Sequence, residues 1–173
     1  MAIITENGTG LSTAETLVSV ADCSAYHLAR GNNNWASITT AQMEEALRRA
    51  SDYMLQVYSL NWLGYRKNST QALDWPRYEV PNLRGGYRVS QNYDSDSVPQ
   101  LVKNAACELA FKAAQGELAP DVTQTVVSEK VDVIEVVYDK NSPQYAQYRA
   151  IDNLLAPFLK SGTSGAFRAT VRT

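Results

Sequence analysis

The chain has 173 residues, of which 45% are hydrophobic and 20% are charged, and its formal net charge at pH 7 is -2. This length and composition are typical of one folded domain and not of a disordered segment. Because the charge balance is slightly acidic, no general positive field draws the protein onto nucleic acid or an anionic membrane. Residues 1–8 lack the basic start and apolar stretch of a signal peptide. We also expect no membrane span, because no uncharged apolar run approaches the ~20 residues that one needs.

Two helices are expected in the first third of the chain. The first begins at the cap-like Ser19 and ends near Gly31. The second begins at Thr39, which forms a Thr-x-x-Gln capping-box pattern with Gln42. Apolar residues then recur at i, i+3 and i+4 and predict one inward face, made of Met43, Ala46, Leu47, Ala50, Tyr53, Met54 and Val57.

Two further helices are expected in the second half. A second capping-box pattern at residues 97–100, with Pro99 in the first turn, predicts a helix that Gly116 ends. Its apolar residues cover most of its surface and several are alanines, which places it in the middle of a bundle. Ser142 and Pro143 predict the start of a fourth helix, which Pro157 should kink or end. Its expected buried residues are Tyr148, Ile151, Leu154, Leu155 and Phe158.

Between these two helices, residues 122–138 are rich in β-branched side chains around a polar break and predict a β-hairpin. A lone hairpin is marginal in water, so we expect it to pack on the helices or to pair with another edge, such as one from a neighbouring subunit. The predicted fold class is therefore mainly α: a small bundle of about four helices with an inserted β-hairpin, a long irregular loop at 61–96 and an extended C-terminal tail. We divide the chain into a helical domain, residues 1–160, and a flexible tail, residues 161–173.

The sequence offers little chemistry for a catalytic site. His27 is the only histidine, and on the first helix it is expected to pack and to form hydrogen bonds. Cys23 and Cys107 have no second cysteine or histidine at metal-ligand spacing, so we expect buried free thiols. The acidic residues between 117 and 139 are scattered over the predicted hairpin as on a solvated face. We therefore expect neither an enzyme nor a protein with a cofactor or a metal ion.

The irregular loop interleaves aromatic and basic side chains. Such residues can stack on unpaired bases and neutralise phosphates, which makes the loop between residues 62 and 93 a possible platform for single-stranded DNA. The same residue types anchor protein interfaces, and loop aromatics also fold back to cap a bundle core. We name as the candidate inter-subunit or partner loop Trp62, Tyr65, Arg66, Trp75, Arg77, Tyr78, Arg84, Tyr87 and Arg88.

Short segments that cover most of the chain form a recognisable set. They are ETLVSVAD at 15–22, AYH at 25–27, RGN at 30–32, ALRRA at 46–50, DY at 52–53, LDWPR at 73–77, VP at 98–99, VKNAACELA at 102–110 and EKV at 129–131. In their order and spacing these segments resemble the head–tail adaptor proteins of tailed bacteriophages, which are the connector or head-completion subunits below the portal. The same group is often catalogued under the name of DnaT-like single-strand DNA-binding proteins.

The resemblance implies a virion structural protein of the neck, made in the bacterial cytoplasm and repeated as a dodecameric ring. Its implied partners are the portal protein, a tail-side stopper or tail-completion protein, and further copies of itself, with DNA only as cargo in the channel and no membrane contact. Since the C-terminal end of such adaptors commonly reaches the portal, the implied portal-docking residues are Phe167, Arg168, Val171 and Arg172, whose alternation suits strand addition to a partner edge. The alternative is a primosome-like single-strand DNA-binding protein that uses the loop 62–93.

Overall fold

The computed structural model describes residues 3–82, 92–120, 126–130, 135–138 and 148–160, and the first long helices begin where the sequence predicts them. Helix α1 (Val20–Leu28) follows Ser19, whose hydroxyl accepts a hydrogen bond from the Asp22 amide at 3.1 Å. Helix α3 (Thr40–Tyr58) follows a complete capping box. Thr39 Oγ1 accepts from the Gln42 amide at 3.3 Å, and Gln42 Oε1 accepts from the Thr39 amide at 2.9 Å. Both predicted N-caps are confirmed.

A short helix that the sequence did not predict lies between them. Helix α2 (Asn33–Ala36) has one turn and no side-chain cap, so neither apolar periodicity nor a capping pattern in the sequence predicts it. Its Trp35 is 1% exposed and contacts the ring of His27, with the ring centroids 4.9 Å apart. The turn is therefore held by packing of one tryptophan and not by its own helical propensity.

Helix α4 (Gln100–Gln115) occupies the middle of the bundle, as predicted. It packs against α3, α5 and α1, and it buries Val102, Ala105, Ala106, Cys107, Leu109, Ala110 and Ala113. Its predicted capping box is wrong: Pro99 is the N-cap residue, and the Ser97 hydroxyl donates to the Asp94 carbonyl at 3.4 Å. The helix starts too late for Ser97 to reach its free amides. Gly116 ends it, as expected.

The last helix is shorter in the described residues than the sequence predicts. Helix α5 (Arg149–Leu155) has Tyr148 as its N-cap residue, and the predicted start at Ser142 and Pro143 lies outside the described residues. After Leu155 the chain continues as a 3₁₀ turn, η1 (Ala156–Phe158), so Pro157 does end the α-helix. Ile151, Leu155 and Phe158 are fully buried, while Tyr148 and Leu154 are half-buried.

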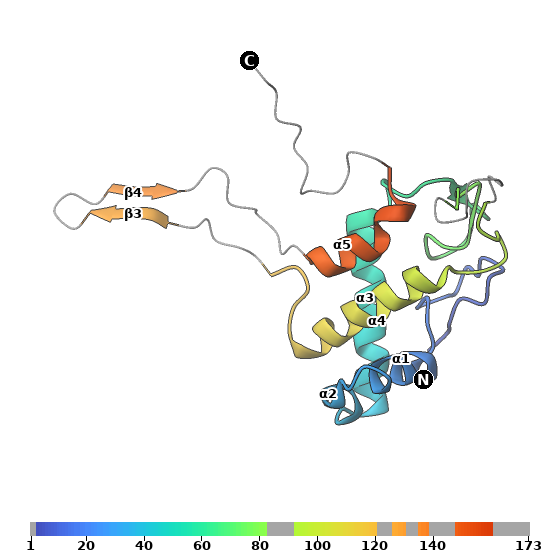
Figure 1. Cartoon of the computed structure of the whole chain (residues 1–173), viewed down its shortest axis with the longest axis horizontal. Coiled ribbons are helices and arrows are strands. Elements are labelled where there is room, and N and C mark those ends of the chain that lie inside the picture. The colour runs from blue at the N-terminus through green and yellow to red at the C-terminus, as the bar shows by residue number, and fades with distance from the viewer. Residues whose placement is uncertain (1–2, 83–91, 121–125, 131–134, 139–147, 161–173) are drawn as a thin grey trace, which may run out of the picture.

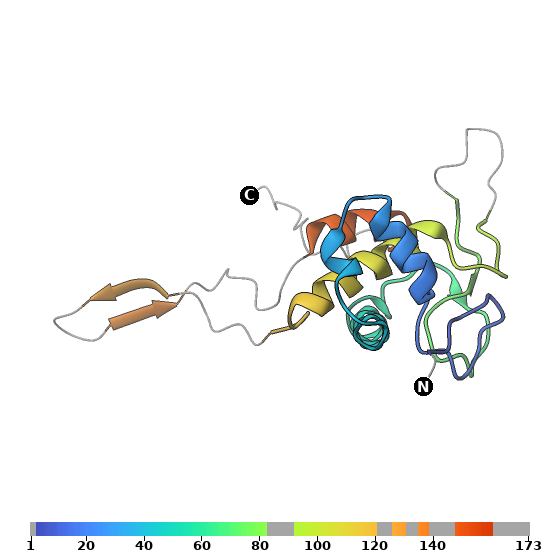
Figure 2. The ribbon, with the colours of Figure 1, turned by 90° about the horizontal axis from the view of Figure 1, so that it is seen from below.

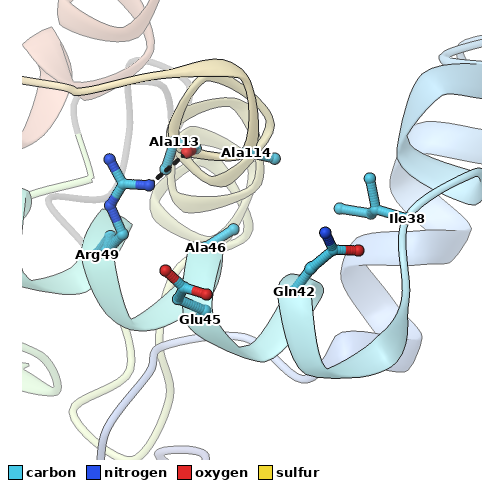
Figure 3. A pocket seen from close by; sticks show the side chains of 7 residues that line it. All are labelled: Ile38, Gln42, Glu45, Ala46, Arg49, Ala113 and Ala114. Atoms are coloured by element: carbon cyan, nitrogen blue, oxygen red, sulfur yellow. Dashed lines mark hydrogen bonds between the residues drawn. The ribbon is translucent and has the colours of Figure 1, made fainter.

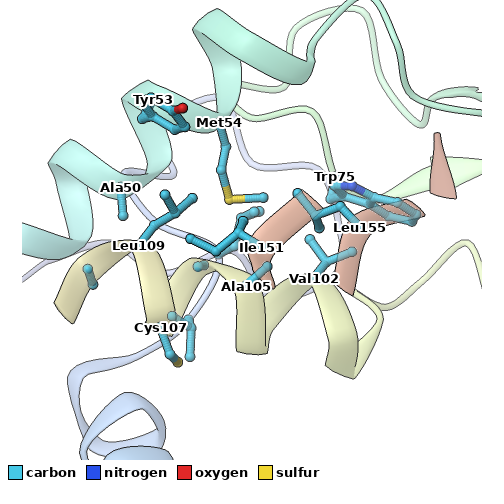
Figure 4. Close-up of a cluster of buried hydrophobic side chains, with 14 of the residues drawn as sticks. Ala50, Tyr53, Met54, Trp75, Val102, Ala105, Cys107, Leu109, Ile151 and Leu155 are labelled. Atoms are coloured by element: carbon cyan, nitrogen blue, oxygen red, sulfur yellow. The ribbon is translucent and has the colours of Figure 1, made fainter. Parts of the chain in front are cut away.

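The core lies where α3, α4 and α5 meet (Figure 4). The figure shows Met54 of α3 pointing between Leu109 of α4 and the α5 residues Ile151 and Leu155. Along α3 the predicted inward face is buried from Ala46 to Met54, while Met43 is half-buried. Beyond Met54, Tyr58 is buried and Val57 is 39% exposed. The buried stripe of the helix therefore shifts by one residue in its last turn.

The predicted irregular loop contains a small two-stranded sheet. Strands β1 (Tyr65–Arg66) and β2 (Arg77–Tyr78) pair antiparallel, with Tyr65 opposite Tyr78 and Arg66 opposite Arg77. Gly64 precedes β1 with φ of 65°, and a Cβ at this residue would lie 2.0 Å from the Tyr78 carbonyl oxygen. Only glycine allows the two segments to approach this closely.

The N-terminal segment, residues 3–18, holds this loop in place. Asn68 Nδ2 donates to the Thr9 carbonyl at 2.8 Å, and the Ala72 amide donates to the Leu11 carbonyl at 2.9 Å. The segment is itself ordered by Glu6, which is 4% exposed and whose carboxylate accepts hydrogen bonds from the amides of Gly8, Gly10 and Leu11. A loop without helical or strand periodicity is thus fixed by hydrogen bonds between distant segments.

The predicted β-hairpin is present. Strands β3 (Val126–Lys130) and β4 (Glu135–Tyr138) pair antiparallel, with Lys130 opposite Glu135 and a register shift between Val126 and Ser128. In both Figure 1 and Figure 2 this hairpin lies apart from the helices, and β3 and β4 pack mainly on each other.

The segment that carries the hairpin leaves and re-enters the helical body at neighbouring points. The Tyr148 hydroxyl donates to the Leu118 carbonyl at 2.8 Å, which joins the residues after α4 to the start of α5. Arg49 of α3 donates to the carbonyls of Ala113 and Gly116, both at 2.7 Å, and so satisfies free acceptors at the end of α4. Two independent contacts therefore fix the base of the hairpin insertion.

Candidate functional site

The predicted partner loop divides into buried and exposed residues. Trp62, Trp75 and Arg77 are 1%, 0% and 6% exposed, so these three belong to the core. Tyr65 and Tyr78 are 54% and 42% exposed. Arg66 is exposed as well, so the six described residues divide evenly: three lie in the core, as the core-capping interpretation expects, and three lie at the surface. Arg84, Tyr87 and Arg88 lie outside the described residues.

Arg77 serves as an internal clamp. Its Nε donates to the Leu63 carbonyl at 2.8 Å, its Nη1 to the Asp74 carbonyl at 3.2 Å and its Nη2 to the Gly64 carbonyl at 2.8 Å. Burial lowers the pKa of its guanidinium from the usual value, and the nearby Asp74 opposes that change. A guanidinium that is 6% exposed and binds three backbone carbonyls is not accessible to a phosphate.

Asp74 organises the other side of the same turn. Its carboxylate accepts hydrogen bonds from the Ser59 hydroxyl at 3.0 Å and from Trp62 Nε1 at 3.2 Å, and Arg66 Nε lies 4.0 Å away. Arg66 also donates to the carbonyls of Gln71 and Leu73. The motif LDWPR at 73–77 therefore specifies a turn: the aspartate, tryptophan and arginine of this motif all point inward.

Two unpartnered polar atoms lie close to this turn. Trp75 Nε1 and the Ser51 hydroxyl are buried and have no hydrogen-bond partner in the structure. Both residues line one small cavity of about 10 Å³ between α3 and the loop, together with Asp74. The cavity is too small for a cofactor or a nucleotide, so it adds no ligand site to the loop.

Among the described aromatic side chains of the loop, Tyr65 and Tyr78 are the exposed ones. They lie opposite each other across β1 and β2, and the Tyr65 hydroxyl donates to the Glu79 carboxylate. This hydrogen bond raises the pKa of Tyr65. The exposed pair could stack on a base, but a carboxylate beside it opposes binding of a phosphate chain.

The described cations are mostly bound within the protein. Arg48 pairs with Glu15 at 2.9 Å, Arg30 lies 3.5 Å from the Tyr26 ring centroid, and Lys112 lies 5.3 Å from the Tyr148 ring centroid. Lys67 binds the Gly8 carbonyl and the Asp96 carboxylate. A nucleic-acid interface usually presents free cations in a stripe or patch, and the described surface shows no such arrangement.

His27 and the two cysteines form part of the contact between α1 and α4. His27 is 0% exposed; its Nε2 lies 3.0 Å from the Cys107 carbonyl, and its Nδ1 lies 3.0 Å from Asn32 Nδ2. These partners suit a neutral ring that donates from Nε2 and accepts at Nδ1. Burial lowers the pKa of His27. Cys23 and Cys107 are free and buried, and a hydrogen bond to Cys107 together with burial raises the pKa of Cys23. Both cysteines are therefore buried free thiols, as predicted.

A shallow groove between α3 and α4 was not predicted (Figure 3). Its volume is about 200 Å³, and it is lined by Ile38, Gln42, Glu45, Ala46, Arg49, Ala113 and Ala114. Arg49 is bound to the end of α4 and Gln42 to the Thr39 amide, which leaves Glu45 as the charged group at its edge. One carboxylate above a floor of small residues has no partner with which to perform acid–base or metal chemistry.

Within the residues described, no cluster of three or more histidine, cysteine, aspartate or glutamate side chains is arranged to hold a metal ion. None of the described helices is long and apolar enough to cross a membrane. The predicted docking residues Phe167, Arg168, Val171 and Arg172 lie outside the described residues.

Comparison with known proteins gives one finding. Neither a curated protein nor a solved structure matches the chain. A family model described as "Putative DnaT-like ssDNA binding protein" matches residues 1–173, the whole length of the sequence. This chain therefore belongs to the family of DnaT-like single-strand DNA-binding proteins, as that family is described.

Proposed function

We propose that this protein is a structural subunit of the neck of a tailed bacteriophage, where it forms a ring between the portal and the tail-side stopper or tail-completion protein. DNA passes through the ring as cargo. The resemblance of ordered segments over most of the chain to phage head–tail adaptors motivates this proposal. No catalytic step, cofactor or membrane contact is part of it.

The β3–β4 hairpin is the observation that carries the proposal. It is a two-stranded sheet that pairs with no other strand of the described chain, and it lies apart from the helices in both views (Figures 1 and 2). A two-stranded ribbon without a packed face is marginally stable by itself, and its open edges favour pairing with another chain. Tyr148 and Arg49 fix the helical body where the insertion begins and ends, and a hairpin inserted there is suited to contact a neighbouring subunit in a ring.

The test is binding to portal rings purified from the same phage, followed by co-sedimentation and electron microscopy. We expect the full-length protein to add one ring to each portal. A chain that lacks residues 166–173 should keep its thermal unfolding midpoint and lose attachment. Failure of the full-length protein to bind the portal contradicts the proposed function. Normal attachment of the truncated protein contradicts only the role assigned to Phe167, Arg168, Val171 and Arg172.

The description of the family favours one second candidate, a single-strand DNA-binding protein. Of the loop predicted to bind DNA, Tyr65 and Tyr78 are the described aromatic residues that remain exposed, so they replace the buried Trp75 and Arg77 as the residues to mutate. Fluorescence anisotropy of a labelled oligonucleotide, measured over a salt series, separates the two functions. The neck-subunit proposal expects no saturable binding near physiological salt. Saturable binding with a steep salt dependence, weakened by Tyr65→Ala or Tyr78→Ala, supports the DNA-binding candidate instead.

A further inference from the structure

Both edges of the β3–β4 hairpin are open. The sheet has two strands, and the described part of the chain contains no third strand that pairs with either of them. In an antiparallel ladder every second residue directs its amide and carbonyl away from the partner strand, so each edge of the hairpin carries backbone groups that a further strand can bind. A further strand also supplies the pairing that an isolated two-stranded sheet lacks for stability.

The register of the hairpin shows which part of each edge is regular. Residues 128–130 of β3 lie opposite residues 135–137 of β4 without a break, whereas the register shifts between Val126 and Ser128. Such a bulge disrupts the ladder and twists the strand locally. The regular stretches are therefore residues 128–130, which we call the β3 edge, and residues 135–137, which we call the β4 edge.

The two edges match each other in residue type. Within the hairpin the basic residue Lys130 is at the register position opposite the acidic residue Glu135. If the β4 edge of one copy pairs with the β3 edge of the next copy in the same register, this match of opposite charges is repeated between copies. An antiparallel pairing of two β3 edges centred on Glu129 would instead place two glutamates opposite each other, which is destabilising. The residue order therefore favours pairing of unlike edges.

Rotational symmetry favours the same arrangement. Copies related by rotation about a ring axis point their hairpins in the same direction. Because β4 runs antiparallel to its own β3, it is also antiparallel to β3 of the next copy when the hairpins lie side by side. Pairing of β4 with β4 of a neighbour needs a two-fold axis between the copies, which turns the neighbour over and stops the growth of a ring. The contact between neighbours in a ring is thus a repeat of the contact within each hairpin.

We propose that the β4 edge of each copy binds the β3 edge of the next copy, so that the hairpins of a ring form one continuous antiparallel sheet. This inference rests on the proposed function, which supplies the ring, and it adds the partner and the register of the hairpin. Each copy contributes two strands, and a sheet that closes on itself leaves no edge open to a further chain.

Disulfide cross-linking between copies tests this pairing. Directly opposite residues in an antiparallel ladder are about 4.5–5.5 Å apart at Cα, which a disulfide can span. Ser128 and Val137 are opposite in the register, so Ser128→Cys and Val137→Cys are made as separate variants. In a mixture of the two, a disulfide between residues 128 and 137 can form only between different copies. The native Cys23 and Cys107 are 0% and 2% exposed and contribute little background.

The mixture is bound to portal rings from the same phage, oxidised mildly and separated by electrophoresis without reductant. Thermal unfolding checks that each variant is folded. We expect the mixture to form at least about tenfold more cross-linked dimer than either variant alone, because only unlike edges meet at disulfide distance. Leu28→Cys is the matched control, since Leu28 is 76% exposed on α1 and belongs to neither edge. Its mixture with Ser128→Cys should form no more dimer than the two variants form separately.

The outcomes separate this inference from the function on which it rests. If the variants bind the portal and their mixture forms no more dimer than the separate variants, the hairpins do not pair in this way and the neck function stands. If Val137→Cys alone forms the dimers, β4 pairs with β4 and the inference is wrong. If the parent does not bind the portal, the proposed function fails and the inference fails with it.

Discussion

At the scale of single residues, His27 is expected to make folding sensitive to mild acid. Its pKa is lowered in the folded protein because the ring is buried, so the unfolded chain, with an ordinary histidine pKa of about 6.5, binds the proton more readily. The free energy of unfolding should therefore be fully retained above about pH 6.5 and fall as the pH drops below that value. Protonation would also place a hydrogen on Nδ1, so that two donors, Nδ1 and Asn32 Nδ2, would face each other.

Urea unfolding of the parent and His27→Gln at pH 7.5, 6.5 and 5.5 tests this expectation. Because His27 is the only histidine, the free energy of unfolding should decrease less between pH 6.5 and 5.5 in the variant than in the parent. Glu15, whose pKa is lowered mainly by its hydrogen bond with Arg48, contributes stability that is lost only in more acidic solution. Equal slopes for the two proteins would show that protonation of His27 is not coupled to unfolding.

Arg77 is expected to be a stability residue. Arg77→Met leaves the buried Asp74 carbonyl and the half-buried Leu63 and Gly64 carbonyls without their donors, and a buried acceptor so deprived costs about 1–3 kcal/mol. Arg77→Lys should recover only part of the loss, because one ammonium group cannot reproduce the planar fork. Arg149, exposed on α5, is the control, and Arg149→Met should change the free energy of unfolding by less than about 0.5 kcal/mol. Denaturant titration that finds Arg77→Met as stable as the control would reject the clamp.

At the scale of elements, the sequence predicted those helix starts whose stabilising hydrogen bonds join residues close to each other in the chain. Thr39 with Gln42 and Ser19 with Asp22 cap helices within four residues, so the sequence contains both partners of each hydrogen bond. The same pattern at Ser97 failed because a cap works only if the helix starts next to it, and α4 starts at Gln100. Helix α2, β1 and β2 depend on distant partners, such as Trp35 on His27, and no local pattern encodes those.

The hairpin insertion is expected to be dispensable for folding of the helical body. Because Leu118 and Tyr148 are joined by a hydrogen bond, a short Gly-Ser linker can replace residues 121–147 without separating α4 from α5. The thermal unfolding midpoint should change by no more than about 2 °C, since the described strands β3 and β4 pack mainly on each other. Under the proposed function, ring formation on the portal should disappear. A large fall in the midpoint, measured by calorimetry, would mean that the hairpin supports the helices.

At the scale of the whole molecule, composition and periodicity predicted a mainly helical body with one β-hairpin, and the structure confirms this class. The candidate site was harder to predict. Aromatic and basic residues are the side chains of a DNA platform, of an interface and of a core alike, and sequence does not distinguish these uses. Burial decides between them for Trp62, Trp75 and Arg77, while the exposed Tyr65 and Tyr78 remain available to partners.

The base of the hairpin insertion also has a mechanical consequence. A force applied to β3 and β4 is transmitted to the helices through two connecting segments. One follows the end of α4, and the other leads into the start of α5. Tyr148 joins these two points, and Arg49 connects the end of α4 to α3. Load applied to the hairpin is thus shared by three helices and is not concentrated on the last turn of one. In a single-molecule stretching experiment with handles on β3 and α1, Arg49→Ala should lower the rupture force at which α4 begins to unwind.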